Sequence, residues 1–190
     1  MEIKKVCVFC GSSPGANAQY TKKAEELGLE LTKRKIGLVY GGAKIGVMGR
    51  IADSVLKNGG EVIGVIPEAL KLKEVAHEGL SKLHVVDNMH SRKALMYEIS
   101  DAFIALPGGI GTLDEFFEIL TWTQLGLHQK PCGLLNVCNY YDKLLDFLDH
   151  MVSEKFVTRR HREMLLVDDT PLKLLDKFFD YHPIQLKKWI

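Results

Sequence analysis

The sequence predicts a doubly wound, Rossmann-like α/β fold, in which helices cover both faces of a parallel sheet. Short runs such as VCVF and VIGVI are apolar throughout, which is typical of strands buried on both faces. Longer amphipathic stretches separate these runs, as the helices of successive β-α-β units do. The 190 residues match the size of one ordinary domain. We therefore expect a single domain over 1–190.

Local patterns predict the individual elements. The first helix is indicated by Ala24, Leu27 and Leu31, which recur at helical spacing. The second helix is expected to stop near Gly59, since glycine is common just after a helix C-terminus. Helices are expected at 17–35, 46–60, 90–100, 112–127 and 140–152. Strands are expected at 6–9, 36–42, 61–67, 84–86, 102–109 and 131–137.

Composition argues against several classes of protein. The net charge is only +1, so the chain lacks the basic footprint of a nucleic-acid-binding protein. No apolar run approaches the ~20 residues that a membrane span needs. The first residues, MEIKKVCVFCGSS, have no signal-peptide pattern. We expect a cytoplasmic protein that binds neither nucleic acid nor membrane.

Cys7 and Cys10 form a C-x-x-C pair, which raises the question of redox or zinc chemistry. A thioredoxin-like pair begins a helix, whereas this pair lies in an apolar run that predicts a strand. The two side chains should therefore face opposite sides of the sheet. Cys132 and Cys138 do not have the spacing of a second zinc-ligand pair. We expect buried, chemically inert thiols and no metal site.

Three predicted strands end in turns rich in glycine and small hydroxyl residues, namely CGSSPG, YGGAKIG and LPGGIGT. In a doubly wound fold, ligands bind beyond the carboxyl ends of the strands, so these turns should converge on one crevice. The backbone N–H groups of 109–112 are expected to bind a phosphate. Further candidate contacts from the other two turns are Gly11, Ser12, Ser13, Gly41, Gly42, Gly46 and Met48.

Standard nucleotide signatures do not fit these turns. No segment supplies the G-x-x-x-x-G-K-[ST] of a P-loop, and the turn after the first strand lacks G-x-G-x-x-G. ATP hydrolysis and nicotinamide chemistry are therefore disfavoured. GSSPG matches the G-x-S-x-G of esterases, with Ser13 as nucleophile. Pro14 removes an N–H from that turn and no histidine stands out as a base, so this alternative is weaker.

The helix after the third turn carries three carboxylates. Thr112 and Glu115 fit a capping box, and Asp114 and Glu118 suit the positive end of the helix dipole. A phosphate at the same helix start would nevertheless be repelled by these carboxylates. We infer that a carboxylate kept there acts on the sugar that carries the phosphate.

Arg92 and Lys93 lie at the start of the helix over 90–100, where cations oppose the dipole and cost up to ~1 kcal/mol each. A locally unfavourable residue often marks a functional site. The alternative is a pair of solvated surface cations. On dipole grounds, Arg92→Ala is expected to lose activity without losing stability.

The segment PGGIGTLDE resembles the PGGxGTxxE motif of the LONELY GUY (LOG) family, and MHSRKALM resembles the family's Arg-Lys segment. The resemblance extends from VCVFCGSSPG through YGGAKIGVMG to TWTQLG. It implies a phosphoribohydrolase that splits a nucleoside 5′-monophosphate, AMP or N6-prenyl-AMP, into free base and ribose 5-phosphate. It also implies a homodimer without a metal or organic cofactor. Relatives have been labelled lysine decarboxylases, but no pyridoxal-phosphate lysine context is evident here.

The resemblance also assigns roles to residues. It makes Glu115 and Arg92 catalytic and Lys93 a neighbouring substrate contact, and it leaves open whether Arg92 orients Glu115 or binds phosphate. Glu74 lies in KLKEVAHEG, which departs most from plant members, so the preferred base also stays open. The alternative function is a nucleotide-sensing module without turnover. The substrate-binding set comprises Glu74, Arg92, Lys93, Gly108, Gly109, Ile110, Gly111, Thr112, Glu115 and Thr121.

Overall fold

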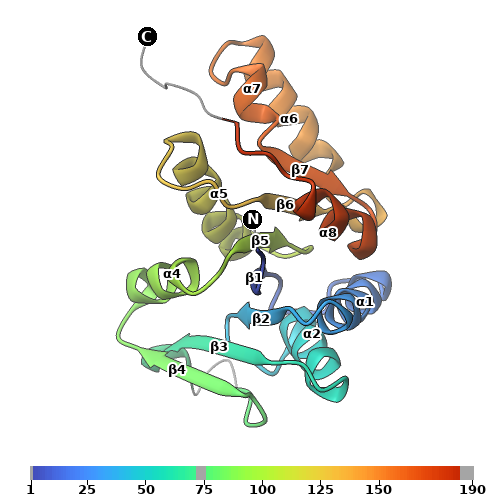
Figure 1. Cartoon of the computed structure of the whole chain (residues 1–190), viewed down its shortest axis with the longest axis vertical. Helices are drawn as coiled ribbons and strands as arrows, with labels where there is room; N and C mark the ends of the chain where they lie inside the picture. The colour runs from blue at the N-terminus through green and yellow to red at the C-terminus, as the bar shows by residue number, and fades with distance from the viewer. Residues whose placement is uncertain (1, 72–75, 185–190) are drawn as a thin grey trace.

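A seven-stranded parallel sheet forms the centre of the computed structural model, which describes residues 2–71 and 76–184 (Figure 1). Its order is β4-β3-β2-β1-β5-β6-β7, and every neighbouring pair is parallel. The doubly wound fold is therefore confirmed. The strands are β1 (Lys5–Phe9), β2 (Gly37–Tyr40), β3 (Val62–Pro67), β4 (Lys82–Val86), β5 (Ala102–Ala105), β6 (Cys132–Leu135) and β7 (Leu165–Asp168).

Helices cover both faces of this sheet. The face with α1, α2 and α8 and the face with α4, α5 and α6 each bury a separate apolar cluster (Figure 1). None of the helices in the described ranges is long and apolar enough to cross a membrane. The helices are α1 (Gln19–Lys33), α2 (Gly46–Lys57), α3 (Glu68–Lys71), α4 (Met89–Glu98), α5 (Ile110–Gln124), α6 (Asp142–Ser153), α7 (Arg159–Arg162) and α8 (Pro171–Phe179), with a 3₁₀ turn η1 at Val137–Asn139.

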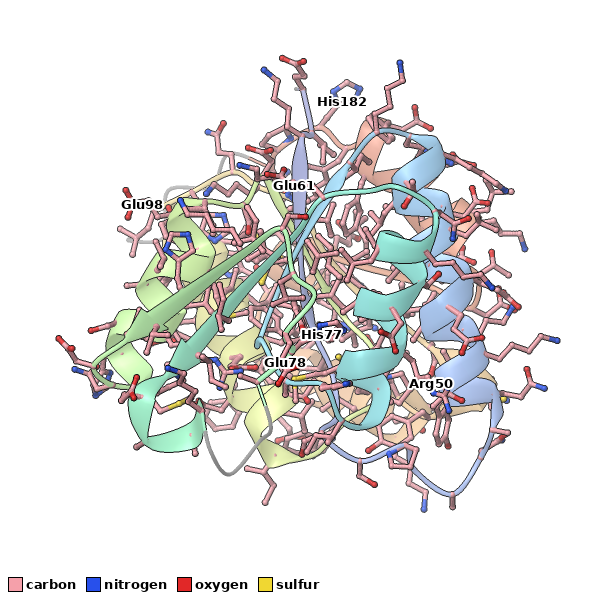
Figure 2. The ribbon with its side chains drawn as sticks, turned by 90° about the horizontal axis from the view of Figure 1, so that it is seen from below. Arg50, Glu61, His77, Glu78, Glu98 and His182 are labelled. Atoms are coloured by element: carbon pink, nitrogen blue, oxygen red, sulfur yellow. The ribbon has the colours of Figure 1, made fainter. Side chains whose placement is uncertain are left out.

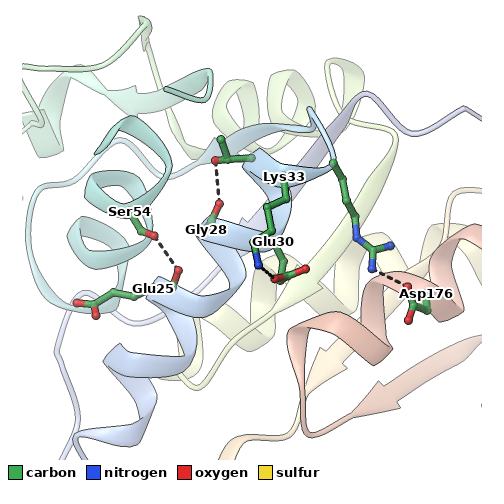
Figure 3. Close-up of polar contacts among 8 residues, drawn as sticks. Glu25, Gly28, Glu30, Lys33, Ser54 and Asp176 are labelled. Carbon is green, nitrogen blue, oxygen red and sulfur yellow. Dashed lines mark hydrogen bonds and ion pairs between the residues drawn. The ribbon is translucent and has the colours of Figure 1, made fainter. Parts of the chain in front are cut away.

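Helices α1, α2 and α8 are joined by polar contacts as well as by packing (Figure 3). The Ser54 hydroxyl on α2 donates to the Glu25 carbonyl oxygen on α1 over 2.7 Å. Just beyond α1, Arg34 bonds Asp176 of α8 at 2.6 Å. These contacts hold the three helices together as one layer on one face of the sheet.

The strand order reverses between β1 and β5, which lie side by side at the centre of the sheet. Chain segments leave these two strands toward opposite sides, so a crevice forms beyond their carboxyl ends. The Gly11 N–H donates to the Pro107 carbonyl oxygen at 3.2 Å and thereby joins the two loops. The Val47 N–H at the start of α2 donates to Gly11 O at 3.1 Å and brings in the third glycine turn.

Cys7 and Cys10 lie in different clusters on opposite faces of the sheet, as the strand interpretation predicts. Both thiols are buried, and burial raises the pKa of each. The redox and zinc interpretations are therefore not supported. Cys138, by contrast, is exposed.

The sequence prediction missed the end of the chain. Strand β7 and helix α8 extend the fold beyond the last expected helix, and α3 and α7 add two short turns. Only the first residue of Leu165–Asp168 is buried, as suits an edge strand, although Leu165, Leu166 and Val167 are all apolar. The expected strand over 131–137 ends at Leu135, where η1 follows.

Candidate active site

Helix α5 begins two residues earlier than expected, at Ile110. Gly109 is its N-cap in extended conformation, and no side chain caps the helix start. Thr112 is thus the third helical residue, and the expected capping box between Thr112 and Glu115 is wrong. The first N–H groups of this 15-residue helix face the crevice without a side-chain cap, which is the arrangement that binds anions.

Glycine at 109 and 111 is not explained by the packing of the described residues. A Cβ built on either residue meets no atom within 4 Å, and neither has a positive φ. At Gly108, in contrast, a Cβ would overlap the Thr112 hydroxyl. Gly108 therefore serves packing, whereas Gly109 and Gly111 keep the backbone bare where a ligand could approach closely.

Arg92 on α4 and Glu115 on α5 form a buried ion pair, with 3.6 Å between Nη2 and Oε1. Their side chains are 7% and 10% exposed. The interpretation of Arg92 as a solvated surface cation is therefore wrong. Gly41, just after β2, makes room for the guanidinium, because a Cβ there would overlap Arg92 Nη2.

Lys93 contacts the other two carboxylates of α5. Its Nζ lies 3.3 Å from Asp114 Oδ2 and 2.9 Å from Glu118 Oε2. The hydrogen bond to Glu118 is the main cause that raises the pKa of Lys93. Arg92 and Lys93 of α4 thus form ion pairs with all three carboxylates of α5. These ion pairs hold the two helices together.

A cavity of about 240 Å³ lies between these helices and the ends of β1 and β2. We call it the acid cavity, because Glu115 and Arg92 both line it. Met48, Leu70 and Met89 supply apolar surface. The candidate residues that the structure brings together here are Gly11, Ser12, Gly41, Met48, Arg92, Gly109, Gly111, Thr112 and Glu115.

A second cavity of about 330 Å³ adjoins the first, and the two share Gly11, Ser12 and Gly109. We call it the tyrosine cavity, because Tyr20 and Tyr140 line it together with Ser13 and Gly108. No histidine is among the described residues that line either cavity. Ser13 Oγ accepts the Gly15 N–H at 3.3 Å, so the structure does not support the esterase interpretation.

Other candidate residues lie elsewhere. Gly42 and Gly46 line neither cavity. Gly46 instead has φ +61° and packs against the backbone of Ser12. Thr121 lines a separate groove between α5, α6 and α7. Ile110 is 88% exposed, and Glu74 lies outside the described residues.

Sequence reasoning missed His77, which connects the segment before β4 to Gly42 and to α2 (Figure 2). Its backbone N–H donates to the Gly42 carbonyl oxygen at 3.0 Å. Its ring accepts the Gly79 N–H at Nδ1 and contacts Asp53 of α2 at 3.0 Å through Nε2. An isolated histidine in a loop gives no sequence signal for such a contact.

Sequence reasoning also missed Tyr140 and Tyr141, which follow β6 and hold the loop after β5 through hydrogen bonds. Across residues 2–71 and 76–184, no cluster of three or more His, Cys, Asp or Glu side chains is arranged to bind a metal ion. The chemical resources of the acid cavity are thus helix-end amides, a guanidinium and two carboxylates, the buried Glu115 and the exposed Asp114. This combination is typical of α/β proteins of the nucleotide-binding class, and it places an acidic group next to a helix start without a side-chain cap.

Comparison with known proteins identifies the particular family. A family model described as "Possible lysine decarboxylase" matches residues 48–178. The cytokinin riboside 5′-monophosphate phosphoribohydrolase of Rhodococcoides fascians is 53% identical over 86% of this chain and 83% of its own length. That of Arabidopsis thaliana, LOG1, is 49% identical over 96% of this chain and 85% of its own length. The chain belongs to the LOG family, as the resemblance of its motifs indicated.

Solved structures show the same fold at low identity. The molybdenum cofactor binding protein of Rippkaea orientalis aligns with a TM-score of 0.70 and 22% identity, over 95% of this chain and 98% of that one. The molybdenum cofactor carrier protein of Chlamydomonas reinhardtii gives 0.68 and 17%, over 95% and 100%. These likenesses concern the fold alone.

The description of the matching family model raises the question of pyridoxal phosphate. That cofactor forms a Schiff base with a lysine whose pKa is lowered. No lysine is among the described residues lining the acid cavity. Lys93 is bound by two carboxylates, and its pKa is raised. The described residues that line the acid cavity therefore do not fit this cofactor.

Proposed function

We propose that this protein hydrolyses the N-glycosidic bond of a nucleoside 5′-monophosphate, AMP or N6-prenyl-AMP, giving free base and ribose 5-phosphate. The observation that carries this proposal is the buried Arg92–Glu115 pair in one cavity with the bare backbone of Gly109 and Gly111. The named activity of relatives about 50% identical supports it.

The proposed mechanism uses both ends of the sugar phosphate. Amides at the start of α5 bind the 5′-phosphate and thereby fix the position of C1′. Cleavage of the bond from C1′ to the base builds positive charge on the sugar, as in glycoside hydrolysis. The Glu115 carboxylate stabilises that charge or activates the attacking water. Arg92, whose Nη2 lies 3.6 Å from Glu115 Oε1, orients the carboxylate in this mechanism.

The decisive experiment is incubation of the purified protein with AMP and with N6-prenyl-AMP, followed by chromatography of the released base. Release of base and ribose 5-phosphate in equal amounts supports hydrolysis. A thermal shift with AMP but no base release would instead indicate a nucleotide-sensing module. The ratio of kcat/KM for the two substrates identifies the preferred base.

Adenosine should be a far poorer substrate than AMP if the amides of 109–112 anchor the phosphate. Hydrogen bonds to a charged group contribute about 1.5–3 kcal/mol each, so loss of two should lower kcat/KM by roughly 10²-fold or more. Turnover should fall as well as affinity, because the phosphate positions the reacting bond. Steady-state kinetics on both compounds checks this. Equal kcat/KM values would leave the glycine loop with only a structural role.

A homodimer is also part of the proposal. Helix α5 carries apolar residues on more than one face, and Phe117, Leu120 and Trp122 are only partly buried within the chain. Leu127, just beyond the helix, is 65% exposed. We expect a second copy to cover part of this surface, where Thr121 also lies. Light scattering at micromolar concentration should give twice the monomer mass, and a monomer would contradict this.

A cytoplasmic location completes the proposal. Cys7, Cys10, Cys132 and Cys138 are all unpaired thiols, and such thiols persist in a reducing compartment. Cell fractionation with an antibody to this protein tests the location.

A further inference from the structure

Two adjacent tyrosines form hydrogen bonds with the loop that leads into α5. Tyr141 Oη donates to the Leu106 carbonyl oxygen, and Tyr140 Oη donates to the Gly108 carbonyl oxygen, each over 2.6 Å. Both tyrosines belong to the segment between η1 and α6, more than 30 residues further along the chain. Hydrogen bonds from a distant segment of the chain thus hold the glycine loop through its carbonyl groups.

The bond from Tyr140 also fixes the direction of an amide. The carbonyl of Gly108 and the N–H of Gly109 belong to one trans peptide, in which they point in opposite directions. Because the carbonyl faces Tyr140, the Gly109 N–H points away from Tyr140, and Gly109 lines the acid cavity as well as the tyrosine cavity. Two glycines flank this peptide, so its own conformational preferences resist rotation only weakly.

We propose that Tyr140 is a positioning residue for phosphate recognition, which aims the Gly109 N–H by binding the Gly108 carbonyl. This inference rests on the proposed function. Tyr140 lies outside the PGGIGTLDE motif, from which that function was argued. Tyr140 is 43% exposed, so water can replace its hydroxyl at the Gly108 carbonyl. Loss of the hydroxyl should therefore loosen the peptide without unfolding the protein.

Tyr141 provides a contrast within the same segment. It makes a bond of the same length, but the peptide that it holds joins Leu106 to Pro107 and has no N–H. Its bond cannot aim a donor at a ligand. Tyr141 is 2% exposed, and its loss would leave a buried carbonyl without a partner. Tyr141→Phe should lower the melting temperature and leave phosphate affinity unchanged.

Tyr20 provides the matched control. Its ring packs edge-on against Tyr140 at 5.5 Å between centroids, in the same cavity. No hydrogen bond of its hydroxyl to a residue in 2–71 or 76–184 holds the glycine loop. Tyr20→Phe therefore removes one hydroxyl from the same surroundings without touching the Gly108 carbonyl.

The test is calorimetric titration of Tyr140→Phe, Tyr141→Phe, Tyr20→Phe and wild type with ribose 5-phosphate and, separately, with adenine. Tyr140→Phe should raise the Kd for ribose 5-phosphate roughly threefold to tenfold, the size of one hydrogen bond. Its Kd for adenine and its melting temperature should stay at wild-type values. An equal rise in KM for AMP should accompany the weaker binding.

An unchanged Kd for ribose 5-phosphate in Tyr140→Phe would overturn the inference, as would an equal weakening of adenine binding. A weakening of the same size in Tyr20→Phe would also overturn it. If wild type binds ribose 5-phosphate but releases no adenine from AMP, the proposed hydrolysis fails, and the binding data still decide the role of Tyr140. If wild type does not bind ribose 5-phosphate, the phosphate loop and the inference both fail.

Discussion

Replacing Glu115 by glutamine should abolish base release while nucleotide binding persists. The substitution removes the negative charge that would stabilise an oxocarbenium-like sugar, and an amide cannot act as a base. General-base catalysis alone is typically worth ~10²–10⁴-fold, and lost charge stabilisation adds to that. Glutamine keeps nearly the same size and can still accept a hydrogen bond from Arg92. Measurement of adenine release and of AMP affinity in the folded variant checks this prediction.

Glu118→Gln is the matched control for this experiment. It makes the same chemical change one turn further along α5, where the side chain contacts Lys93 and lies outside the acid cavity. Lys93 keeps its contact with Asp114 in that variant. Glu118→Gln should retain most of the wild-type turnover. If Glu115→Gln keeps more than about a tenth of wild-type turnover, less than a typical general-base contribution has been lost, and the mechanism is wrong.

Arg92→Ala should lower kcat/KM at least about 10²-fold, because in the proposed mechanism the guanidinium beside Glu115 orients that carboxylate. The structure also changes the expectation for stability. Removal of one partner of a buried pair is commonly worth 3–5 kcal/mol, so about that loss is expected here instead of the neutral effect of the dipole argument. Urea denaturation and kinetics at the same temperature separate the two effects.

Gly41→Ala offers a test that keeps the charge. A methyl group at 41 would overlap Arg92 Nη2 and push the guanidinium away from its place. We expect turnover to fall although both ionised groups remain. Comparison of AMP with adenosine then assigns the role of Arg92. Equal losses on both substrates indicate orientation of Glu115, whereas a loss confined to AMP would show that Arg92 binds the phosphate.

The central strands and the glycine turns could be predicted because their signals are local. Apolar runs over β1, β2, β3 and β5 are unbroken, and a strand buried on both faces requires such runs. Strand β7 was missed although Leu165, Leu166 and Val167 form an apolar run of the same local kind. The start of α5 was misplaced because Thr112 matched a capping pattern, whereas Gly109, which has no side chain to signal a cap, occupies the position.

The motif residues of the site could also be predicted, but their environment could not. The place of the Arg92 guanidinium depends on the missing side chain of Gly41, which follows β2 about 50 residues earlier in the chain. The contact between Tyr140 and Gly108 likewise joins segments 32 residues apart. Such side-chain contacts form only when the sheet brings the strand ends together, so no local sequence pattern predicts them.

The central position of β1 bears on how the protein is made. This strand covers residues 5–9 and is synthesised before its neighbour β5, which begins only at residue 102. At a synthesis rate of about 5–20 residues per second, one edge of β1 waits roughly 5–20 s for its partner. During that interval the apolar faces of β1 and the thiols of Cys7 and Cys10 lack their final cover. Strand β1 therefore completes its pairing only after α4 and β5 have emerged.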